Sequence, residues 1–272
     1  MKLIFLDIDG TLTPAGSNTP PESALEAIRA AQAAGHKVFL CTGRNMDMLK
    51  PVLQYSFDGV VASSGGYVTS GEQVIYDCPM TDAECSKAMR LFQECGAYRT
   101  VEALDGSYCD DGLAEFLNQT SGGNSELVRW RKALEKNLGI RPMSEYDGRP
   151  IYKIVFMCRT EDQIAPVRDA MGDAFSIVVQ DMAGANCING EFISKQFDKG
   201  SGIRQIAEAL GVSMEDTVGF GDSMNDLEMI QVVGKSVCMA NGSPRLQAIS
   251  DLICPSVEED GLAWGFRELG LL

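Results

Sequence analysis

Short apolar runs of strand length alternate with helix-like segments near both ends of this 272-residue chain. Helix signals lie between the runs: Thr19 and Glu22 have capping-box spacing, and Gly35 suits a helix end. Because apolar strands separated by helices pair in parallel beneath two helical layers, the pattern predicts a doubly wound α/β fold. The clearest runs are residues 2–8 (KLIFLDI), 37–41 (KVFLC), 59–64 (GVVASS) and 217–220 (TVGF).

The middle of the chain, residues 81–188, follows a different pattern. Strand-like runs occur there in pairs, which favours antiparallel pairing, and helices are expected over 81–96, 125–139 and 160–172. We therefore expect a Rossmann-like parallel-sheet core formed by residues 1–80 and 189–272, with an inserted α+β domain over 81–188. A hairpin with its turn near Ser70 is expected at the end of the first core segment.

The composition narrows the function classes. A formal charge of −15 disfavours nucleic acids and anionic membranes as partners, because both require clustered basic residues. The sequence shows neither a signal-peptide pattern nor a membrane-spanning apolar run, so a cytoplasmic location is expected. The nine irregularly spaced cysteines are expected to be free thiols. His36 is the only histidine, which favours Mg²⁺ held by oxygen ligands over zinc.

The first apolar run ends in two aspartates, Asp7 and Asp9, followed by Gly10. A buried carboxylate is costly unless it is paired or bound to a metal, and strand alternation would place these two on the same side. One carboxylate could attack phosphorus, while the other protonates the leaving group and later activates water. Gly10 would allow a sharp turn that brings N–H groups near an anion. A solvated Asp-Gly turn is the alternative interpretation.

Two further clusters could bind a phosphate group. In CTGR (41–44), the Thr42 hydroxyl and the Gly43 N–H follow a strand and are suited to a phosphate oxygen. In DKGSG (198–202), Lys199 would place a positive charge at a helix start, where the helix dipole adds its own partial charge. Taken alone, each is also explained by an ordinary polar turn or a surface lysine.

A glycine-flanked acidic cluster, GFGDSMNDLEMI (219–230), follows another strand and opens a helix. Asp222 could complete a Mg²⁺ site with Asp7, Asn225 could donate to a phosphate, and Asp226 could orient the ligands or Lys199. Simple helix capping is the alternative, because aspartate is favoured there in any case. The order of the four clusters, each after a strand or at a helix start, is more informative than any one of them.

These four clusters resemble, in order, the motifs of the haloacid dehalogenase-like hydrolase superfamily, and the overall pattern is similar to its Cof-type phosphatases. The resemblance implies that Asp7 is the nucleophile and Asp9 the general acid/base. It implies a Mg²⁺ site made by the Asp7 carboxylate, the Asp9 backbone carbonyl and Asp222, with Asp226 in support. The phosphate ligands that it implies are the Ile8 N–H, Thr42, Gly43, Lys199 and Asn225.

The spacing of the motifs indicates where the family's cap would be inserted. Only the interval between Thr42 and Lys199 is long enough for a second domain, so residues 81–188 are expected to form a cap that selects the substrate. Candidate contacts in the cap are the return segment AGANCING (183–190) and Trp130 between two arginines, although ordinary packing also explains the tryptophan. The chain departs from the family at SSGGYV (63–68), where relatives often carry Asn-Gly-Ala.

The leading hypothesis is a Mg²⁺-dependent phosphatase that hydrolyses a small phosphorylated metabolite, with a sugar phosphate preferred, through an aspartyl-phosphate. One rival is a phosphotransferase or mutase, which would pass the phosphoryl group to an acceptor sugar. A second rival is a non-catalytic sensor of a phosphometabolite. The sequence leaves the substrate open among phosphosugars, pyridoxal phosphate and flavin mononucleotide, and it leaves open whether the protein is a monomer or a dimer.

Overall fold

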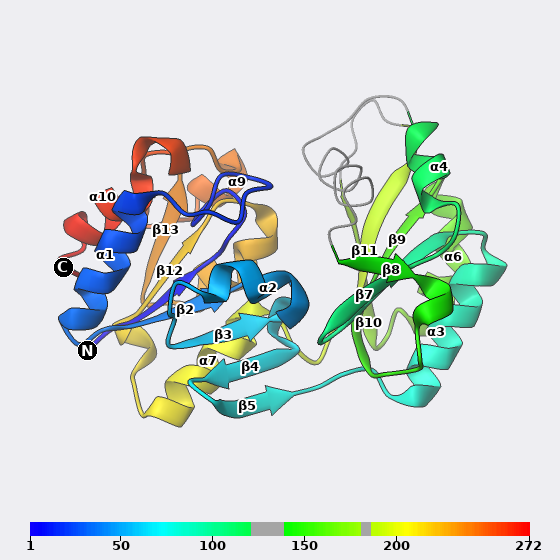
Figure 1. Cartoon of the computed structure of the whole chain (residues 1–272), viewed down its shortest axis with the longest axis horizontal. Helices are drawn as coiled ribbons and strands as arrows, with labels where there is room; N and C mark the ends of the chain where they lie inside the picture. Colours follow the sequence, from blue (N-terminus) through cyan, green and yellow to red (C-terminus); the bar gives the residue numbers. More distant parts are fainter. Residues whose placement is uncertain (121–138, 181–185) are drawn as a thin grey trace. The chain divides into compact units, whose positions relative to one another are not determined.

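The computed structural model describes residues 1–120, 139–180 and 186–272 (Figure 1). The chain divides into two compact units. The first contains Met1–Arg44, Leu49–Asp77 and Phe197–Leu272, and the second contains Asn45–Met48 and Cys78–Gln196. No helix in the described ranges combines the length and the apolar character that a membrane crossing requires.

The first unit is built on an eight-stranded sheet with the order β14-β13-β12-β1-β2-β3-β4-β5. The six strands from β14 to β3 pair in parallel, which confirms the doubly wound fold predicted from the alternating pattern. The hairpin β4–β5 extends the sheet antiparallel, with its turn at the expected place. The strands are β1 (Leu3–Leu6), β2 (Lys37–Cys41), β3 (Gly59–Ala62), β4 (Tyr67–Ser70), β5 (Gln73–Asp77), β12 (Thr217–Gly221), β13 (Lys235–Met239) and β14 (Leu252–Cys254).

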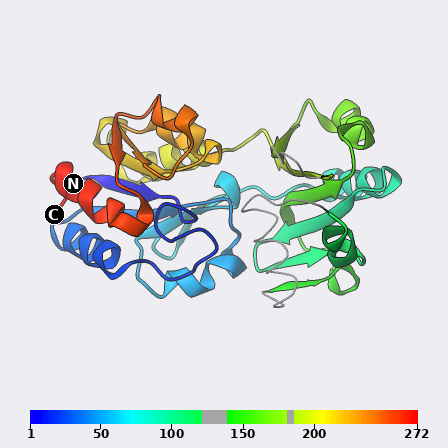
Figure 2. The same ribbon diagram turned by 90° about the horizontal axis from the view of Figure 1, so that it is seen from above.

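Helices cover both faces of this sheet (Figure 2). On one face, Leu3 and Phe5 of β1 pack against helices α7 (Lys199–Leu210) and α8 (Leu227–Val232). On the other, α1 (Glu22–Ala33) packs against α10 (Gly261–Glu268), whose Phe266 contacts Phe220 of β12. The shorter helices α2 and α9 span Met46–Leu53 and Pro244–Gln247. Asp7 follows β1 directly and lies on the α7 side of the sheet, where it contacts Lys199.

Helix α1 does not use the capping box expected from Thr19 and Glu22. It begins at Glu22, its N-cap is Pro21, and no side chain bonds the first turn. The cause is the pair of prolines, since a residue that precedes proline is held in extended backbone and the helix cannot start before it.

The second unit contains a six-stranded sheet with the order β10-β11-β9-β6-β7-β8, antiparallel except for the β7–β8 pair. Helices α3 (Asp82–Glu94) and α6 (Ala165–Met171) pack on one face, and α4 (Leu113–Asn118) packs on the other. This is the inserted α+β architecture that was expected. The strands are β6 (Tyr98–Ala103), β7 (Gly106–Cys109), β8 (Ile140–Pro142), β9 (Ile151–Cys158), β10 (Phe175–Gln180) and β11 (Ile188–Ser194).

The boundaries of the two units differ from the expected 80/81 and 188/189. Strand β11 pairs with β9 and β10, so the second unit ends at Gln196 rather than before Asn189. The segment Asn45–Met48 also belongs to the second unit, where the buried Asn45 amide donates to Ala103 O and Ser107 Oγ. The helix expected over 125–139, with Trp130, lies almost entirely outside the described residues.

Candidate active site

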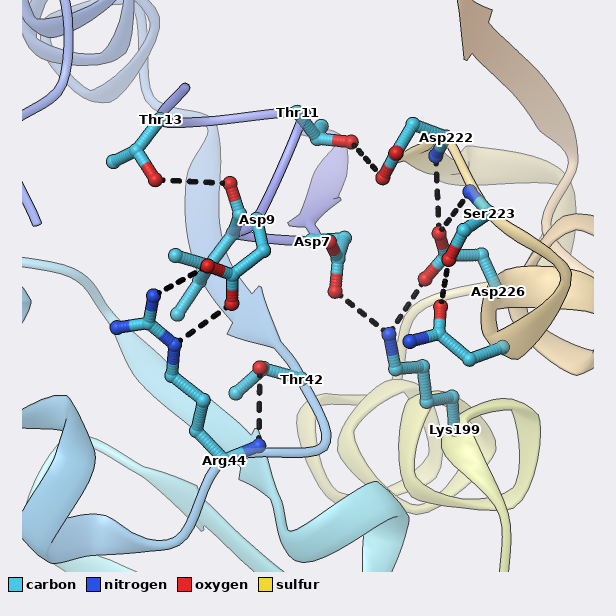
Figure 3. A network of polar contacts seen from close by, with 12 residues as sticks. Asp7, Asp9, Thr11, Thr13, Thr42, Arg44, Lys199, Asp222, Ser223 and Asp226 are labelled. Carbon is cyan, nitrogen blue, oxygen red and sulfur yellow. Dashed lines mark hydrogen bonds and ion pairs between the residues drawn. The ribbon is translucent and has the colours of Figure 1, made fainter. Parts of the chain in front are cut away.

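The polar clusters gather at the carboxyl edge of the parallel sheet in the first unit. Strand β1 lies between β12 and β2, where the order of strands reverses, and doubly wound folds place their ligands at such a position. The chain leaves β1 at Leu6, and the Asp7 N–H donates to Phe220 O of β12 at 3.0 Å. The loops that follow β1, β2 and β12 therefore meet at one spot (Figure 3).

Asp7, Lys199 and Asp226 form a buried chain of ion pairs. Lys199 Nζ lies 2.7 Å from Asp7 Oδ1 and 2.6 Å from Asp226 Oδ1. Asp198 begins α7 with a capping box, which fixes the Lys199 backbone at the helix start. Asp226 Oδ2 accepts from the N–H groups of Asp222 and Ser223, so both of its oxygens are engaged. Asp226 thus holds Lys199 and the acidic loop together, the arrangement that its expected supporting role requires.

Asp222 approaches the same place from the end of β12. One carboxylate oxygen each from Asp7, Asp222 and Asp226 lie within 4.8 Å of one another, and Thr11 Oγ1 donates to Asp222 Oδ1. Gly10 makes this approach possible. Its φ is +94°, and a Cβ there would lie 2.5 Å from Asp222 Oδ2. Glycine has no Cβ and adopts positive φ readily, so it alone fits both this backbone conformation and the close approach of Asp222.

Burial dominates the electrostatics of the cluster. Burial and the Asp226 carboxylate raise the pKa of Asp7 well above its ordinary value, against the opposing effect of Lys199. The same two causes raise the pKa of Asp222 to about 7. For Lys199, burial lowers the pKa, but the carboxylates of Asp226 and Asp7 outweigh it and keep the ammonium charged. The lysine alone therefore does not neutralise the acidic side chains around it.

This donor set fits a hard divalent cation. When ionised, the three carboxylates carry about two more negative charges than the single ammonium beside them balances. A divalent cation matches that excess, and carboxylate oxygens are the ligands that Mg²⁺ prefers. Because Asp226 is already engaged on both oxygens, Asp7 and Asp222 are the side chains suited to hold the ion.

Thr42 lies on the other side of β1, at the end of β2. Its side chain is buried, its Oγ1 accepts from Arg44 N at 3.2 Å, and its carbonyl accepts from Ser64 N at 3.0 Å. Gly43 is next in the same half-buried turn. The segment that departs from the family, SSGG, thus supports the turn: Ser63, Ser64 and Gly65 all have positive φ, and Ser63 N donates to Arg44 O. Among the described residues, buried Ser63 Oγ has no hydrogen-bond partner.

Asp9 does not follow the strand alternation expected of it. Strand β1 ends at Leu6, so the chain turns before Asp9, and its carboxylate pairs with Arg44 rather than with Lys199. The two aspartates therefore share a loop but pair with different basic side chains, Asp7 with Lys199 and Asp9 with Arg44 (Figure 3). Asp7 is almost fully buried, whereas the Asp9 side chain is 21% exposed. A less buried carboxyl group is better placed to exchange protons with a substrate or water.

The other two expected phosphate ligands are close in sequence to this cluster. Ile8 is buried in the loop after Asp7, and its carbonyl accepts from the N–H groups of Leu12 and Thr13. Asn225 is exposed, and its Oδ1 accepts from Ser223 Oγ at 2.7 Å, which directs its NH₂ group away from that serine. Their roles as phosphate ligands remain predictions.

Sequence reasoning missed two polar residues in this region. Arg44, the last residue of CTGR, contacts Asp9, and Thr11 contacts Asp222. Both stand inside quoted motifs, so their position was the available signal. His36 lies outside this cluster, and its Nδ1 accepts from Lys2 N.

Comparisons with known proteins identify the family of the chain. The family model described as haloacid dehalogenase-like hydrolase matches residues 4–266. YkrA of Bacillus subtilis, whose name describes it as a candidate phosphatase, is 29% identical and is covered over 98% of its length by the whole chain. YwtE of the same organism, named as a 5-amino-6-(5-phospho-D-ribitylamino)uracil phosphatase, is 26% identical, with 99% of this chain and 98% of YwtE aligned.

Solved structures match over the full chain. A protein from Geobacillus kaustophilus aligns with a TM-score of 0.81 and 25% identity, covering 100% of this chain and 99% of that one. The subclass IIB sugar phosphatase BT4131 aligns with a TM-score of 0.78 and 24% identity over 100% of both chains, which shows a shared fold. The chain therefore belongs to the haloacid dehalogenase-like hydrolases, as a phosphatase of the Cof type.

Proposed function

We propose that this protein is a cytoplasmic, Mg²⁺-dependent phosphatase that hydrolyses a small phosphorylated metabolite, with sugar phosphates as the preferred class, through an aspartyl-phosphate. The observation that carries the proposal is the placement of Asp7. It stands at the carboxyl end of β1, is bound by Lys199 at 2.7 Å, and lies beside Asp222. A buried carboxylate held in this way is preorganised for attack, so little conformational entropy is lost when it reacts.

In the first step, Asp7 attacks the phosphorus atom of the substrate. Lys199 binds Oδ1, so we assign Oδ2 as the attacking oxygen. The new bond joins Oδ2 to phosphorus, and the bond between phosphorus and the leaving oxygen breaks. Asp9 gives a proton to that oxygen, so the alcohol leaves uncharged.

In the second step, water attacks the phosphorus of the aspartyl-phosphate. Asp9, now a carboxylate, takes a proton from the water, and the bond between phosphorus and the Asp7 oxygen breaks. Inorganic phosphate and the original Asp7 carboxylate result. The presence of a second carboxylate in reach of this step favours hydrolysis over a long-lived phosphoaspartate.

Transferred phosphate carries negative charge into an acidic site, so charge neutralisation is essential. Lys199 supplies one positive charge, and Thr42, Gly43, Ile8 and Asn225 are the proposed phosphate donors. When bound by Asp7, Asp222 and the Asp9 carbonyl, Mg²⁺ would add positive charge next to the phosphate oxygens.

The second unit is proposed to act as the cap that selects the leaving group. In its sheet, buried Lys153 contacts Glu102 and Glu191 at 3.3 and 2.8 Å. Polar side chains of this kind support a hydroxylated leaving group rather than an apolar one. The names of YwtE and BT4131, a ribityl-phosphate and a sugar phosphatase, point in the same direction.

A screen of phosphorylated metabolites with Mg²⁺, scored by phosphate release, tests the proposal. Asp7→Asn should abolish turnover, and Asp9→Asn should lower it strongly. Exposed Asp169→Asn, which changes the same group outside the site, should not. Full turnover by Asp7→Asn contradicts the mechanism. Transfer to an added sugar instead of water identifies the phosphotransferase, and saturable binding without any phosphate release identifies the sensor.

A further inference from the structure

Arg44 and Asp9 form a two-pronged ion pair that the proposed mechanism does not use. Arg44 Nε donates to Asp9 Oδ2 at 2.9 Å, and Nη2 donates to Oδ1 at 2.7 Å. The side chains are only 12% and 21% exposed, so water screens the pair less than an ordinary surface salt bridge. A planar guanidinium that meets both carboxylate oxygens fixes the rotation of the carboxylate as well as its position.

The arginine is itself held from several directions. Its third side-chain arm, Nη1, donates to Asn18 Oδ1 at 2.7 Å, which fixes the plane of the guanidinium. Its backbone N–H donates to Thr42 Oγ1, and its carbonyl accepts from Ser63 N. An anchored arginine can transmit its geometry to the group that it binds, whereas a mobile surface arginine cannot.

Asp9, in contrast, lies beyond the end of β1 and is not part of the sheet. Strand β1 ends at Leu6, and Asp9 lies in a turn in which Gly10 N donates to Thr13 O. Strand geometry thus does not determine where its carboxylate points. The Arg44 guanidinium contacts both Asp9 carboxylate oxygens.

From these contacts, and resting on the proposed function, we propose that Arg44 is a positioning residue for the general acid/base. It sets the direction of the Asp9 carboxyl group toward the leaving oxygen, and Asn18 sets the direction of Arg44. Arg44 does not bind the substrate phosphate in this role. One of its two bonds to Asp9 weakens when that carboxyl group carries the proton that it donates, since a protonated oxygen is a weaker acceptor than a carboxylate oxygen.

The leaving group provides the test. p-Nitrophenolate is a good leaving group and departs without protonation, whereas the leaving oxygen of a sugar must be protonated. Misplacement of Asp9 should therefore slow the hydrolysis of a sugar phosphate much more than that of p-nitrophenyl phosphate. We expect Arg44→Ala to lower kcat/KM for a hexose 6-phosphate by about 100-fold and for p-nitrophenyl phosphate by less than about 10-fold. The ratio of the two values is the readout, because it cancels changes in the amount of folded protein.

Binding of inorganic phosphate separates positioning from phosphate recognition. If Arg44 only positions Asp9, the inhibition constant of inorganic phosphate stays within about 2-fold of the wild type in Arg44→Ala. An unchanged aryl-to-alkyl ratio, or a rise of about 10-fold or more in that inhibition constant, overturns the inference. If the wild-type protein releases no phosphate from any compound, the proposed phosphatase function is wrong instead. The two failures can therefore be distinguished.

Matched variants keep the test decisive. Arg29→Ala removes another bidentate-capable arginine, whose pair with Glu22 is exposed, and should leave the ratio unchanged. Added guanidinium should restore part of the sugar-phosphate activity of Arg44→Ala but none of Asp9→Asn. If Arg44→Ala does not fold, Asn18→Ala, which keeps the ion pair but releases the third arm, should change the ratio in the same direction by a smaller factor. No change in the ratio for Asn18→Ala then overturns the inference.

Discussion

Lys199 Nζ lies 2.7 Å from Asp7 Oδ1, although 192 positions of sequence separate the two residues. The pair is almost fully buried, and it joins the loop after β1 to the start of α7. The contact depends on the parallel sheet, because only the fold brings these two distant segments together. The functional geometry is thus a product of the fold rather than of either motif alone.

Lys199→Met should destabilise the protein as well as inactivate it. The substitution keeps most of the length of the side chain but leaves Asp7 and Asp226 buried without the Lys199 counter-charge, which typically costs about 3–5 kcal/mol. Urea unfolding at pH 8 measures the loss. The loss should shrink as the pH is lowered, because burial raises the pKa of Asp7 and a protonated carboxyl group needs no counter-charge. A pH-independent loss would contradict the electrostatic cause.

Gly10→Ala should weaken the Asp222 site, and Gly16→Ala provides the matched control. Both glycines have positive φ, which costs an alanine about 1–2 kcal/mol. At Gly16 nothing lies within 4 Å of a new Cβ, whereas at Gly10 the Cβ would lie 2.5 Å from Asp222 Oδ2. We expect Gly10→Ala alone to reduce Mg²⁺ affinity, measured by calorimetry. Equal effects of the two substitutions would show that backbone strain, not the close approach, matters.

The sequence predicted those parts of the molecule that local patterns determine. Alternating apolar runs predicted the parallel core, and the order of the motifs, each after a strand or at a helix start, predicted that Asp7, Lys199 and Asp222 converge, as observed. Strand β11 was missed as part of the second unit because its Asn189 and Gly190 are poor strand formers, and its pairing with β9 is nonlocal.

The direction of a side chain in a loop was beyond the reach of the sequence. Alternation placed Asp9 beside Asp7, but alternation holds only within a strand, and β1 ends at Leu6. The partner of Asp9 is Arg44, which comes from the loop after a neighbouring strand. The pairing of neighbouring strands in the sheet brings Asp9 and Arg44 together, so no periodic pattern in the sequence predicts this ion pair.

Lys153→Met should destabilise the second unit. Lys153 is buried between Glu102 and Glu191, and the carboxylates raise its pKa although burial opposes them. Removal of the ammonium leaves the buried Glu102 charge uncompensated, with an expected loss of about 3 kcal/mol. Hydrogen exchange should rise in β6, β9 and β11 and stay unchanged in β1 and β12. The double variant Lys153→Met/Glu102→Gln should recover part of the loss; if it loses more, the ionic explanation is wrong.

Mg²⁺ binding should weaken as the pH falls below about 7. Burial and the Asp226 carboxylate raise the pKa of Asp222 to about 7, so below that value a proton occupies the oxygen that the cation needs. Displacing one proton costs about tenfold in affinity for each pH unit below the pKa. Calorimetric titration with Mg²⁺ at pH 5.5, 6.5, 7.5 and 8.5 measures the slope, which should flatten at the two highest values.

The same raised pKa predicts the opposite trend for the metal-free protein. Between about pH 4 and pH 7 the folded state keeps a proton on Asp222 that the unfolded state has released, so this group favours folding at low pH and loses its contribution as the pH rises. The difference in unfolding free energy between the wild type and Asp222→Asn, measured in urea with a chelator, isolates the effect from other carboxylates. As the pH rises through this window, the wild type should lose stability relative to Asp222→Asn. Saturating Mg²⁺ should reverse this change. A difference that does not vary with pH would mean that Asp222 is ionised throughout, and the cation would then bind with no proton to displace.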